Sequence, residues 1–386
     1  MDKICQALNN GDFILGVCID LSKAFDTVNH SILFDKLHEY GIRGIALEWF
    51  KSFLTNRKQC VNYKDNLSQN NEVQCGVPQG SILGPILFLL YVNDLALVSE
   101  TLFLIMFADD TNLFITGKNV NDLIDTMNNE INKITEWLNA NKLSLNVKKT
   151  QYMLISGFKK LPNNIHNVLI NGNKVDRVNS IKFLGVIIDS KLTWSDHIAY
   201  IKTKISKSIG ILCKARKKLA KDTLLTLYYC FVNSYLQYGI EVWGNTHNIY
   251  INSLFLLQKK SIRIINNVKP KNSTSKLFTE QGILNIFKLY KVSIAVFMYK
   301  FMKGNLPVVF NNMFTFNCET HNYNVRGAYK LKIPFCKLSL SKMQARYTGV
   351  KIWNYIDSKI DSKCSIHSYR KLVKSFFISS DVPVFD

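Results

Sequence analysis

A continuous apolar run of strand length, Phe13–Ile19, stands near the start of the chain. Because both faces of such a run need cover, it predicts a buried central strand, and that strand ends at Asp20. Farther on, two short apolar segments, 102–107 and 113–115, flank the pair Asp109-Asp110. Two such segments around a polar pair predict a β-hairpin with the pair at its tip.

Three later segments predict shorter strands. Residues 142–155 contain two strand-like pieces, and the Asn171-Gly172 pair is typical of a tight hairpin turn. Residues 181–189 predict a further strand pair with a turn or bulge at Gly185.

Apolar residues at helical spacing dominate the rest of the chain. The clearest stripe runs over 121–141, and Ser31 is a suitable cap for a helix over 32–40. A glycine-rich loop, 76–81, precedes an apolar helix that we expect to reach about residue 95. Further helices are predicted over 45–54, from 196 onward, over 222–238, 249–266 and 284–303, and within 346–378.

Length and composition indicate two or three folded subdomains. The chain has 386 residues, 47% of them hydrophobic, which suffices for a buried core. We find neither a signal-peptide pattern nor an apolar run long enough to span a membrane. Nine dispersed cysteines lack metal-ligand spacing and suggest reduced thiols. We therefore expect an intracellular protein of the cytoplasm or nucleus, not secreted and without a membrane partner.

The charge is divided unevenly along the chain. Residues 1–116 carry 8 Lys and Arg against 13 Asp and Glu, whereas residues 117–386 carry 41 against 15. Such a division suits a cation-binding centre joined to a polyanion-binding surface, although a merely basic protein is the alternative. One helix is basic without any acid from residue 202 to 221, and its cations are Lys202, Lys204, Lys207, Lys214, Arg216, Lys217, Lys218 and Lys221. It is either a phosphate-binding surface or a solvated or membrane-surface face.

Asp20 and the Asp109-Asp110 pair are the candidate chemical centre. Taken singly, each is more simply explained as an acid in a turn. If the strand and the hairpin lie side by side in one sheet, however, three carboxylates converge. Carboxylate oxygens are the ligands that Mg²⁺ prefers, and two such ions can promote in-line phosphoryl transfer.

In this order of motifs the sequence resembles the reverse transcriptases of non-LTR, LINE-type retrotransposons, especially the jockey-like group. The resemblance covers about residues 10–310. Segments 20–26, 76–83 and 107–111 look like the first three palm motifs, 137–150 resembles the fourth, and 183–194 resembles the primer-grip region.

The resemblance implies an α+β fold in which a polymerase palm, an antiparallel sheet with packed helices, is followed by an all-helical basic thumb. The implied domains are a palm over 1–195, a thumb and connection over 196–306, and a C-terminal region of uncertain structure over 307–386. The implied activity is RNA-directed DNA polymerisation, with an RNA template, a DNA primer and deoxynucleoside triphosphates as partners. The implied cofactor is a pair of Mg²⁺ ions, with Mn²⁺ as a substitute.

The resemblance also assigns roles to residues. Asp20 and Asp109 would ligate both metal ions with help from the Leu21 carbonyl, Asp110 would be the secondary acid, and Lys149 would donate a proton or contact phosphate. The nucleotide-binding residues would be Leu21, Ser22, Lys23, Ala24, Phe25, Gln79 and Gly80. Within that set the Ser22–Phe25 amides would hold the triphosphate and Phe25 would exclude a 2′-hydroxyl. Phe183, Leu184 and Gly185 would hold the primer end.

The chain departs from the family in one respect. The first palm motif begins about 19 residues after Met1, so the fingers region and the endonuclease domain that precede it in relatives are expected to be missing. The alternative is therefore a truncated, catalytically inactive relic, or a nucleic-acid-binding protein.

Overall fold

The computed structural model describes residues 1–157, 159–319 and 327–379. The chain divides into two compact units. We call residues 11–179 the sheet unit and residues 1–10 with 180–386 the helical unit, and each is described by itself.

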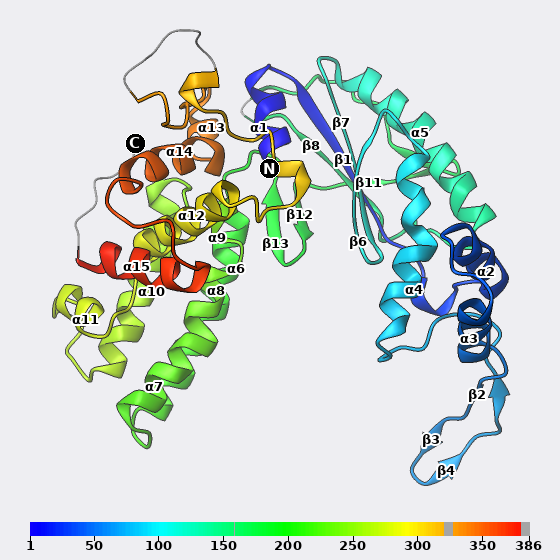
Figure 1. Cartoon of the computed structure of the whole chain (residues 1–386), viewed down its shortest axis with the longest axis horizontal. Coiled ribbons are helices and arrows are strands. Elements are labelled where there is room, and N and C mark those ends of the chain that lie inside the picture. The colour runs from blue at the N-terminus through cyan, green and yellow to red at the C-terminus, as the bar shows by residue number, and fades with distance from the viewer. Residues whose placement is uncertain (158, 320–326, 380–386) are drawn as a thin grey trace. The chain divides into compact units, whose positions relative to one another are not determined.

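A five-stranded sheet in the order β11-β8-β1-β7-β6 is the centre of the sheet unit. Its strands are β1 (Phe13–Ile19), β6 (Phe103–Phe107), β7 (Asp110–Gly117), β8 (Gln151–Ile155) and β11 (Asp176–Arg177). The predicted central strand is confirmed, because β1 pairs antiparallel with both β7 and β8 (Figure 1). The expectation of a purely antiparallel sheet is wrong at one edge, where β11 runs parallel to β8. The chain reaches that edge only after a further hairpin over 169–174.

Four α-helices cover the sheet or pack beside it. They are α2 (His30–Glu39), α3 (Ile45–Leu54), α4 (Leu83–Val92) and α5 (Val120–Ala140), with 3-10 turns η1 (Ala24–Asp26) and η2 (Asn93–Leu97). The stripe predicted over 121–141 is confirmed, since α5 buries Ile124, Met127 and Ile131 and contacts β1 and β7 (Figure 1). Ser31 is not the cap of α2. Asn29 takes that position and accepts the N–H of Ile32, while Ser31 donates its hydroxyl to Asn29.

Short hairpins complete the sheet unit. They are formed by β2 (Lys58–Gln59) with β5 (Asn71–Glu72), β3 (Asn62–Tyr63) with β4 (Asn66–Leu67), and β9 (Leu169–Ile170) with β10 (Asn173–Lys174). The turn predicted at Asn171-Gly172 is confirmed by positive φ angles of 49° and 75°. Of the two strand pieces predicted in 142–155, only β8 forms; the earlier piece is a loop held by a single bridge from Leu145 to Leu21.

The helical unit also contains one hairpin, β12 (Ser180–Phe183) with β13 (Val186–Asp189). Its helices are α1 (Asp2–Asn9), α6 (Ser195–Ala215), α7 (Lys221–Tyr228), α8 (Ser234–Gln237), α9 (Ile240–Trp243), α10 (Asn248–Ile265), α11 (Ser275–Glu280), α12 (Ile286–Met302), α13 (Ser339–Lys342), α14 (Ala345–Ile356) and α15 (Ile366–Ser379). A π-turn, η3 (Tyr229–Asn233), joins α7 to α8, and η4 (Val308–Phe310) and η5 (Asn317–Glu319) are single 3-10 turns. The predicted helices at 222–238, 249–266 and 284–303 are confirmed.

The helical unit includes both ends of the domain predicted over 1–195. Helix α1 contacts α13, and Asp2 forms a 3.0 Å ion pair with Arg346. Strand β13 packs on α6. The compact sheet unit therefore begins at Gly11 and ends at Asn179, whereas the functional boundaries at 195 and 306 stay predictions. Among the helices in the described ranges, none has both the length and the apolar character that crossing a bilayer requires.

His197, in the first turn of α6, is a buried histidine in the core of the helical unit. Its exposed fraction is 2%, and its ring lies edge-on to Trp243 with centroids 5.3 Å apart. Its Nδ1 accepts the N–H of Ile187 at 3.3 Å, and its Nε2 has no partner among the described residues. Burial lowers the pKa of His197 to about 4, so the folded protein holds the neutral ring.

We expect His197 to make the folded state less stable in acid. Because its pKa is about 4 in the folded state and 6.5 otherwise, the unfolded chain binds the extra proton first as the pH falls through 6.5, and the loss is complete below 4. Urea unfolding at about pH 7 and about pH 5 measures this loss. The His197→Leu variant should lose less free energy of unfolding between those two pH values than wild type. Equal losses would contradict this interpretation.

Candidate active site

The structure brings Asp20 and the hairpin acids to the same edge of the sheet. The β1–β7 register pairs Ile19 with Thr111, and one further step along it sets Asp20 opposite Asp110. The predicted hairpin is confirmed as β6–β7, but its tip is Ala108-Asp109 rather than the acid pair. Ala108 has a φ of +52°, and Asp110 is already the first residue of β7, paired with Phe107. The two neighbouring acids therefore occupy different positions, one in the turn and one on the strand.

The carboxylates at this edge act on one another electrostatically. The pKa of Asp110 is raised, first by desolvation and then by the negative charges of Asp109 and Asp20. In β1, burial and then the Asp110 charge raise the pKa of the Cys18 thiol to about 12. This edge therefore has a negative potential that a bound cation would relieve.

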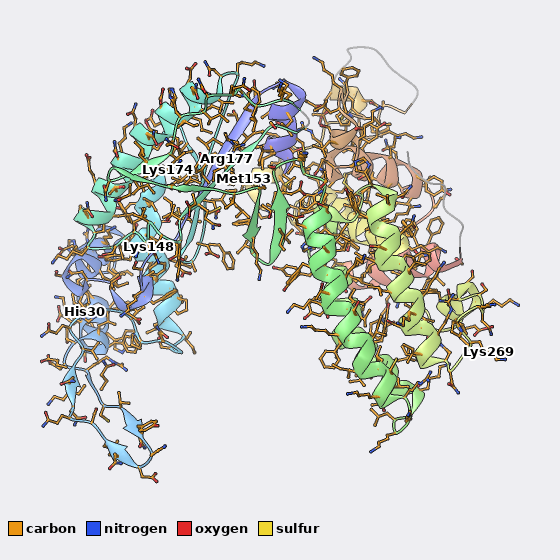
Figure 2. The ribbon with its side chains drawn as sticks, turned by 180° about the vertical axis from the view of Figure 1, so that it is seen from behind. His30, Lys148, Met153, Lys174, Arg177 and Lys269 are labelled. Atoms are coloured by element: carbon orange, nitrogen blue, oxygen red, sulfur yellow. The ribbon has the colours of Figure 1, made fainter. Side chains whose placement is uncertain are left out.

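Lys149 supplies one positive charge beside Asp20. Its Nζ lies 3.8 Å from Asp20 Oδ2, and the two side chains are 72% and 40% exposed. An ion pair so open to water contributes little to stability, so the lysine can exchange Asp20 for another anion. Its neighbour Lys148 is exposed on the same loop (Figure 2).

Backbone hydrogen bonds fix the loop that carries Lys149 to the end of β1. The Ser22 N–H donates to the Ser144 carbonyl, and the Asn146 N–H donates to the Asp20 carbonyl, both at 2.8 Å. These two bonds form an antiparallel β-bridge in which Leu21 lies opposite Leu145. The carbonyl of Leu21 accepts neither bond. Of the amides predicted to hold a triphosphate, that of Ser22 is occupied by this bond.

The glycine-rich loop is tied to the same segment from the other side. The Val77 N–H donates to the Phe25 carbonyl at 2.8 Å, and the Gly76 N–H donates to the Val28 carbonyl at 2.7 Å. The His30 Nε2 lies 2.8 Å from the Gly76 carbonyl (Figure 2). Gly76 has a φ of +87°, and a Cβ there would come within 2.7 Å of the Asp26 carbonyl oxygen. Only glycine allows this close approach.

The remaining nucleotide-binding candidates surround this junction. Phe25 stacks on Phe88, with centroids 4.5 Å apart, and Gln79 Nε2 donates to Asp26 Oδ1 at 2.8 Å. The sequence interpretation gave Asp26 no role, although it ends the motif that begins at Asp20. Lys23 and Gly80 are exposed, and Ala24 is buried.

The predicted primer-grip and thumb residues belong to the helical unit. Leu184 and Gly185 form the β12–β13 turn directly after Phe183, and the Tyr238 hydroxyl donates to the Leu184 carbonyl at 2.6 Å. Of the eight cations between 202 and 221, all are exposed except the half-buried Lys204. Their roles stay predictions.

The chemistry of the acids suits a divalent cation, but the described residues contain no cluster of three or more His, Cys, Asp or Glu that could hold a metal ion as it stands. What fits is the donor type, hard carboxylate oxygens, and their shared place at the end of β1. The pKa of Asp110 is raised by desolvation and then by the charges of Asp109 and Asp20, and a bound cation would counter the second of these effects. The ligand set itself stays a prediction.

Residues 3–188 match the family profile described as "Reverse transcriptase (RNA-dependent DNA polymerase)". The chain is 27% identical over 272 residues to "Probable RNA-directed DNA polymerase from transposon X-element" of Drosophila melanogaster, covering 69% of this chain and 30% of the relative. It is 28% identical over 271 residues to "RNA-directed DNA polymerase from mobile element jockey" of Drosophila funebris, covering 67% and 29%. The chain therefore spans less than a third of the length of these relatives.

A solved telomerase from Candida tropicalis, in complex with a fragment of telomeric RNA, aligns with a TM-score of 0.40 and 12% identity over 98% of this chain and 52% of that one. That likeness is too low to support a conclusion.

We expect Gly76→Ala to destabilise the protein more than Gly80→Ala. Both glycines have φ near +80°, but an added Cβ meets the Asp26 backbone at Gly76 and open space at Gly80. The strained φ should cost about 1 kcal/mol in each variant, and the contact at Gly76 a further ~1–3 kcal/mol. Urea unfolding of both variants measures the difference. Equal free energies of unfolding would show that the glycine loop does not need its close contact with Asp26.

Proposed function

We propose that the domain over residues 3–188, which matches the reverse transcriptase family, is of the LINE-type, jockey-like kind and that the chain extends a DNA primer on an RNA template. One observation carries the proposal for this chain. Asp20 directly follows the last paired residue of the central strand and acts electrostatically on Asp110, and the glycine loop and the Lys149 loop are bonded to Asp20 and the residues that follow it. A nucleotidyltransferase needs such a rigid acidic edge beside a loop that can admit a nucleotide.

In this proposal Asp20 and Asp109 hold two Mg²⁺ ions, or Mn²⁺ as a substitute, with the Leu21 carbonyl as a further ligand and Asp110 as the secondary acid. When bound, the ions supply neutralising charge for the attacking hydroxyl and the leaving pyrophosphate. Desolvation and then the charges of Asp109 and Asp20 raise the pKa of Asp110, and a cation bound at this edge would offset the repulsion between the carboxylates. The turn position of Asp109 leaves its side chain exposed and able to reorient toward Asp20.

The loop after Asp20 is proposed to bind the incoming deoxynucleotide. With the Ser22 amide bonded to Ser144, the triphosphate would rely on the amides of Lys23, Ala24 and Phe25. Phe25, held against Phe88, presents a fixed aromatic wall that would exclude a ribose 2′-hydroxyl. Gln79 and Gly80 would line the nascent base pair, and the Gln79–Asp26 hydrogen bond orients that side chain.

Lys149 is proposed to serve the leaving group. Its weak, exposed pairing with Asp20 keeps an ammonium at the acidic edge and lets it move to a phosphate oxygen, where it donates a proton or a hydrogen bond. The primer end would be held by Phe183, Leu184 and Gly185. The eight cations between 202 and 221, which lie on α6, in the turn after it and at the start of α7, would contact the phosphates of the template–primer duplex.

A second candidate function is nucleic-acid binding without catalysis. The observation that favours it is that the described acids do not gather into a metal-binding cluster. The two candidates differ in one respect that can be measured, the dependence of DNA synthesis on the carboxylates.

We expect Asp20→Asn to reduce primer extension on an RNA template by about a hundredfold or more, because the variant loses a proposed ligand of the metal ions that neutralise charge at the reacting phosphate. The assay measures single-turnover incorporation by the full chain with Mg²⁺ present. The matched control is Asp65→Asn, which removes one exposed carboxylate from the β3–β4 turn and should keep wild-type activity. If wild type, Asp20→Asn and Asp65→Asn all gave the same background, the chain would not be a polymerase and the second candidate would stand.

A further inference from the structure

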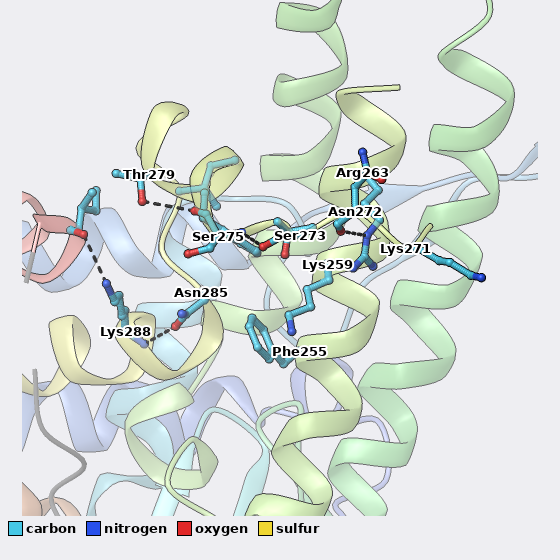
Figure 3. Close-up of a pocket in the computed structure, with 14 residues that line it drawn as sticks. Phe255, Lys259, Arg263, Lys271, Asn272, Ser273, Ser275, Thr279, Asn285 and Lys288 are labelled. Atoms are coloured by element: carbon cyan, nitrogen blue, oxygen red, sulfur yellow. Dashed lines mark hydrogen bonds between the residues drawn. The ribbon is translucent and has the colours of Figure 1, made fainter. Parts of the chain in front are cut away.

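A basic cavity of about 320 Å³ lies within the helical unit, away from the palm motifs in sequence. It is bounded by the second half of α10, the loop after that helix, α11 and the first turn of α12 (Figure 3). Four cationic side chains line it, and no Asp or Glu is among the lining residues; the cations are Lys259, Arg263, Lys271 and Lys288.

Two of these cations are held in place on the same face of α10, one turn apart. The Lys259 ammonium lies 4.2 Å from the centroid of the Phe255 ring. The Arg263 Nε donates to the Asn272 carbonyl at 3.0 Å, which fixes the plane of the guanidinium (Figure 3). Both side chains are half-buried, and no salt bridge within the described residues includes either of them. Half-buried cations without a carboxylate favour an anion between them.

The other walls add hydrogen-bonding groups and apolar surface. Lys288 enters from the first turn of α12, where its N–H is capped by the Asn285 side chain at 2.9 Å and its Nζ lies 3.4 Å from the Ile378 carbonyl. Ser273 contributes a hydroxyl from the loop, and Ser275 contributes one from the start of α11 (Figure 3). Phe255 and Phe278 contribute ring surface, and their centroids are 6.2 Å apart.

We propose that this cavity binds a backbone phosphate of single-stranded RNA, with the attached nucleoside against the Phe255–Phe278 wall. A guanidinium with a fixed plane and an adjacent ammonium match the oxygens of a phosphate diester. An apolar wall beside the cations suits a sugar and base, which a free phosphate does not have. We infer an RNA strand rather than a free anion as the occupant because the same unit carries the mostly exposed cations between 202 and 221, which are proposed above to contact further phosphates. The proposal rests on the RNA-template function proposed above and adds a contact outside its catalytic motifs.

The test compares two double variants of the full chain that lose the same charge. Lys259→Gln with Arg263→Gln removes the two cations of the cavity. Lys260→Gln with Lys276→Gln removes two exposed cations from α10 and α11. These two helices bound the cavity, but Lys260 and Lys276 do not line it. Binding of a fluorescent oligouridylate is measured by anisotropy at several KCl concentrations, and thermal melting checks that both variants fold.

We expect the cavity variant to bind the oligouridylate about tenfold more weakly than wild type. The plot of log K against log[salt] should become less steep by about 1.4, the value for two lost contacts to a single strand. The control variant should stay within about twofold of wild type. Photocrosslinking with 4-thiouridine-containing RNA should label the peptides around Phe255 in wild type and not in the cavity variant.

Equal losses in the two double variants would overturn the proposal, because binding would then depend only on total charge. The proposal would also be overturned if the cavity substitutions weakened the binding of inorganic phosphate but not that of the oligouridylate. The cavity would then be a site for a free anion. Asp20→Asn should bind the oligouridylate like wild type. Loss of polymerase activity and loss of this RNA contact are therefore separate results.

Discussion

The position of the loop after β1 is the constraint on which the rest of the candidate site depends. β1 is the middle strand of the sheet, bonded on one side to β7 and on the other to β8. The loop that follows it is bonded in turn to residues 144–146 and to residues 76–77. Four segments that are far apart in the sequence, the end of β1, the glycine loop, the β6–β7 turn and the Lys149 loop, are thus joined largely by backbone hydrogen bonds. Such bonds do not depend on side-chain identity, so the acids can be displayed without being needed for stability.

This arrangement explains why the edge can tolerate uncompensated charge. Three carboxylates within electrostatic reach of one another destabilise the folded state, and this repulsion adds to desolvation in raising the pKa of Asp110. The cost is small because Asp20 is partly exposed and Asp109 and Asp110 are exposed, and the hydrogen-bonded scaffold supports them. A strained acidic edge held by a rigid frame is the usual condition of a site that gains from binding a cation. The helical unit has the opposite character, with cations on α6 and around the α10 cavity.

Several elements of the fold could be predicted from the sequence because short local patterns of residues determine them. The apolar run of β1, the stripe of α5 and the Asn171-Gly172 turn each specify their structure within a few residues. Asp20 and the hairpin acids were predicted to meet from the position of the acids at strand ends; β1 and β7 are neighbours, as that prediction requires, and the convergence of the three carboxylates stays a prediction. The family resemblance added the roles, which position alone does not give.

The predictions that differ from the structure concern features that contacts between distant parts of the chain determine. Asn29 and Ser31 are both good helix caps, and the chain path into α2 decides between them. The parallel pairing of β11 and the packing of α1 and the β12–β13 hairpin with the helical unit are long-range contacts that no local window contains. Ala108 at positive φ, which moves the hairpin tip one residue from the expected acid pair, is an unusual choice for that conformation. The Gln79–Asp26 bond joins residues 53 positions apart, so the role of Asp26 was not visible in either motif alone.

Mn²⁺ binding is a direct test of the proposal that the edge formed by Asp20, Asp109 and Asp110 is a divalent-cation site. Electron paramagnetic resonance of free Mn²⁺ during titration with the full chain measures the ion bound without requiring catalysis. The account predicts that wild type binds Mn²⁺, that Mg²⁺ competes for the site, and that Asp20→Asn loses the binding while Asp65→Asn retains it. Equal Mn²⁺ binding by wild type and Asp20→Asn, or none by wild type, would contradict the account.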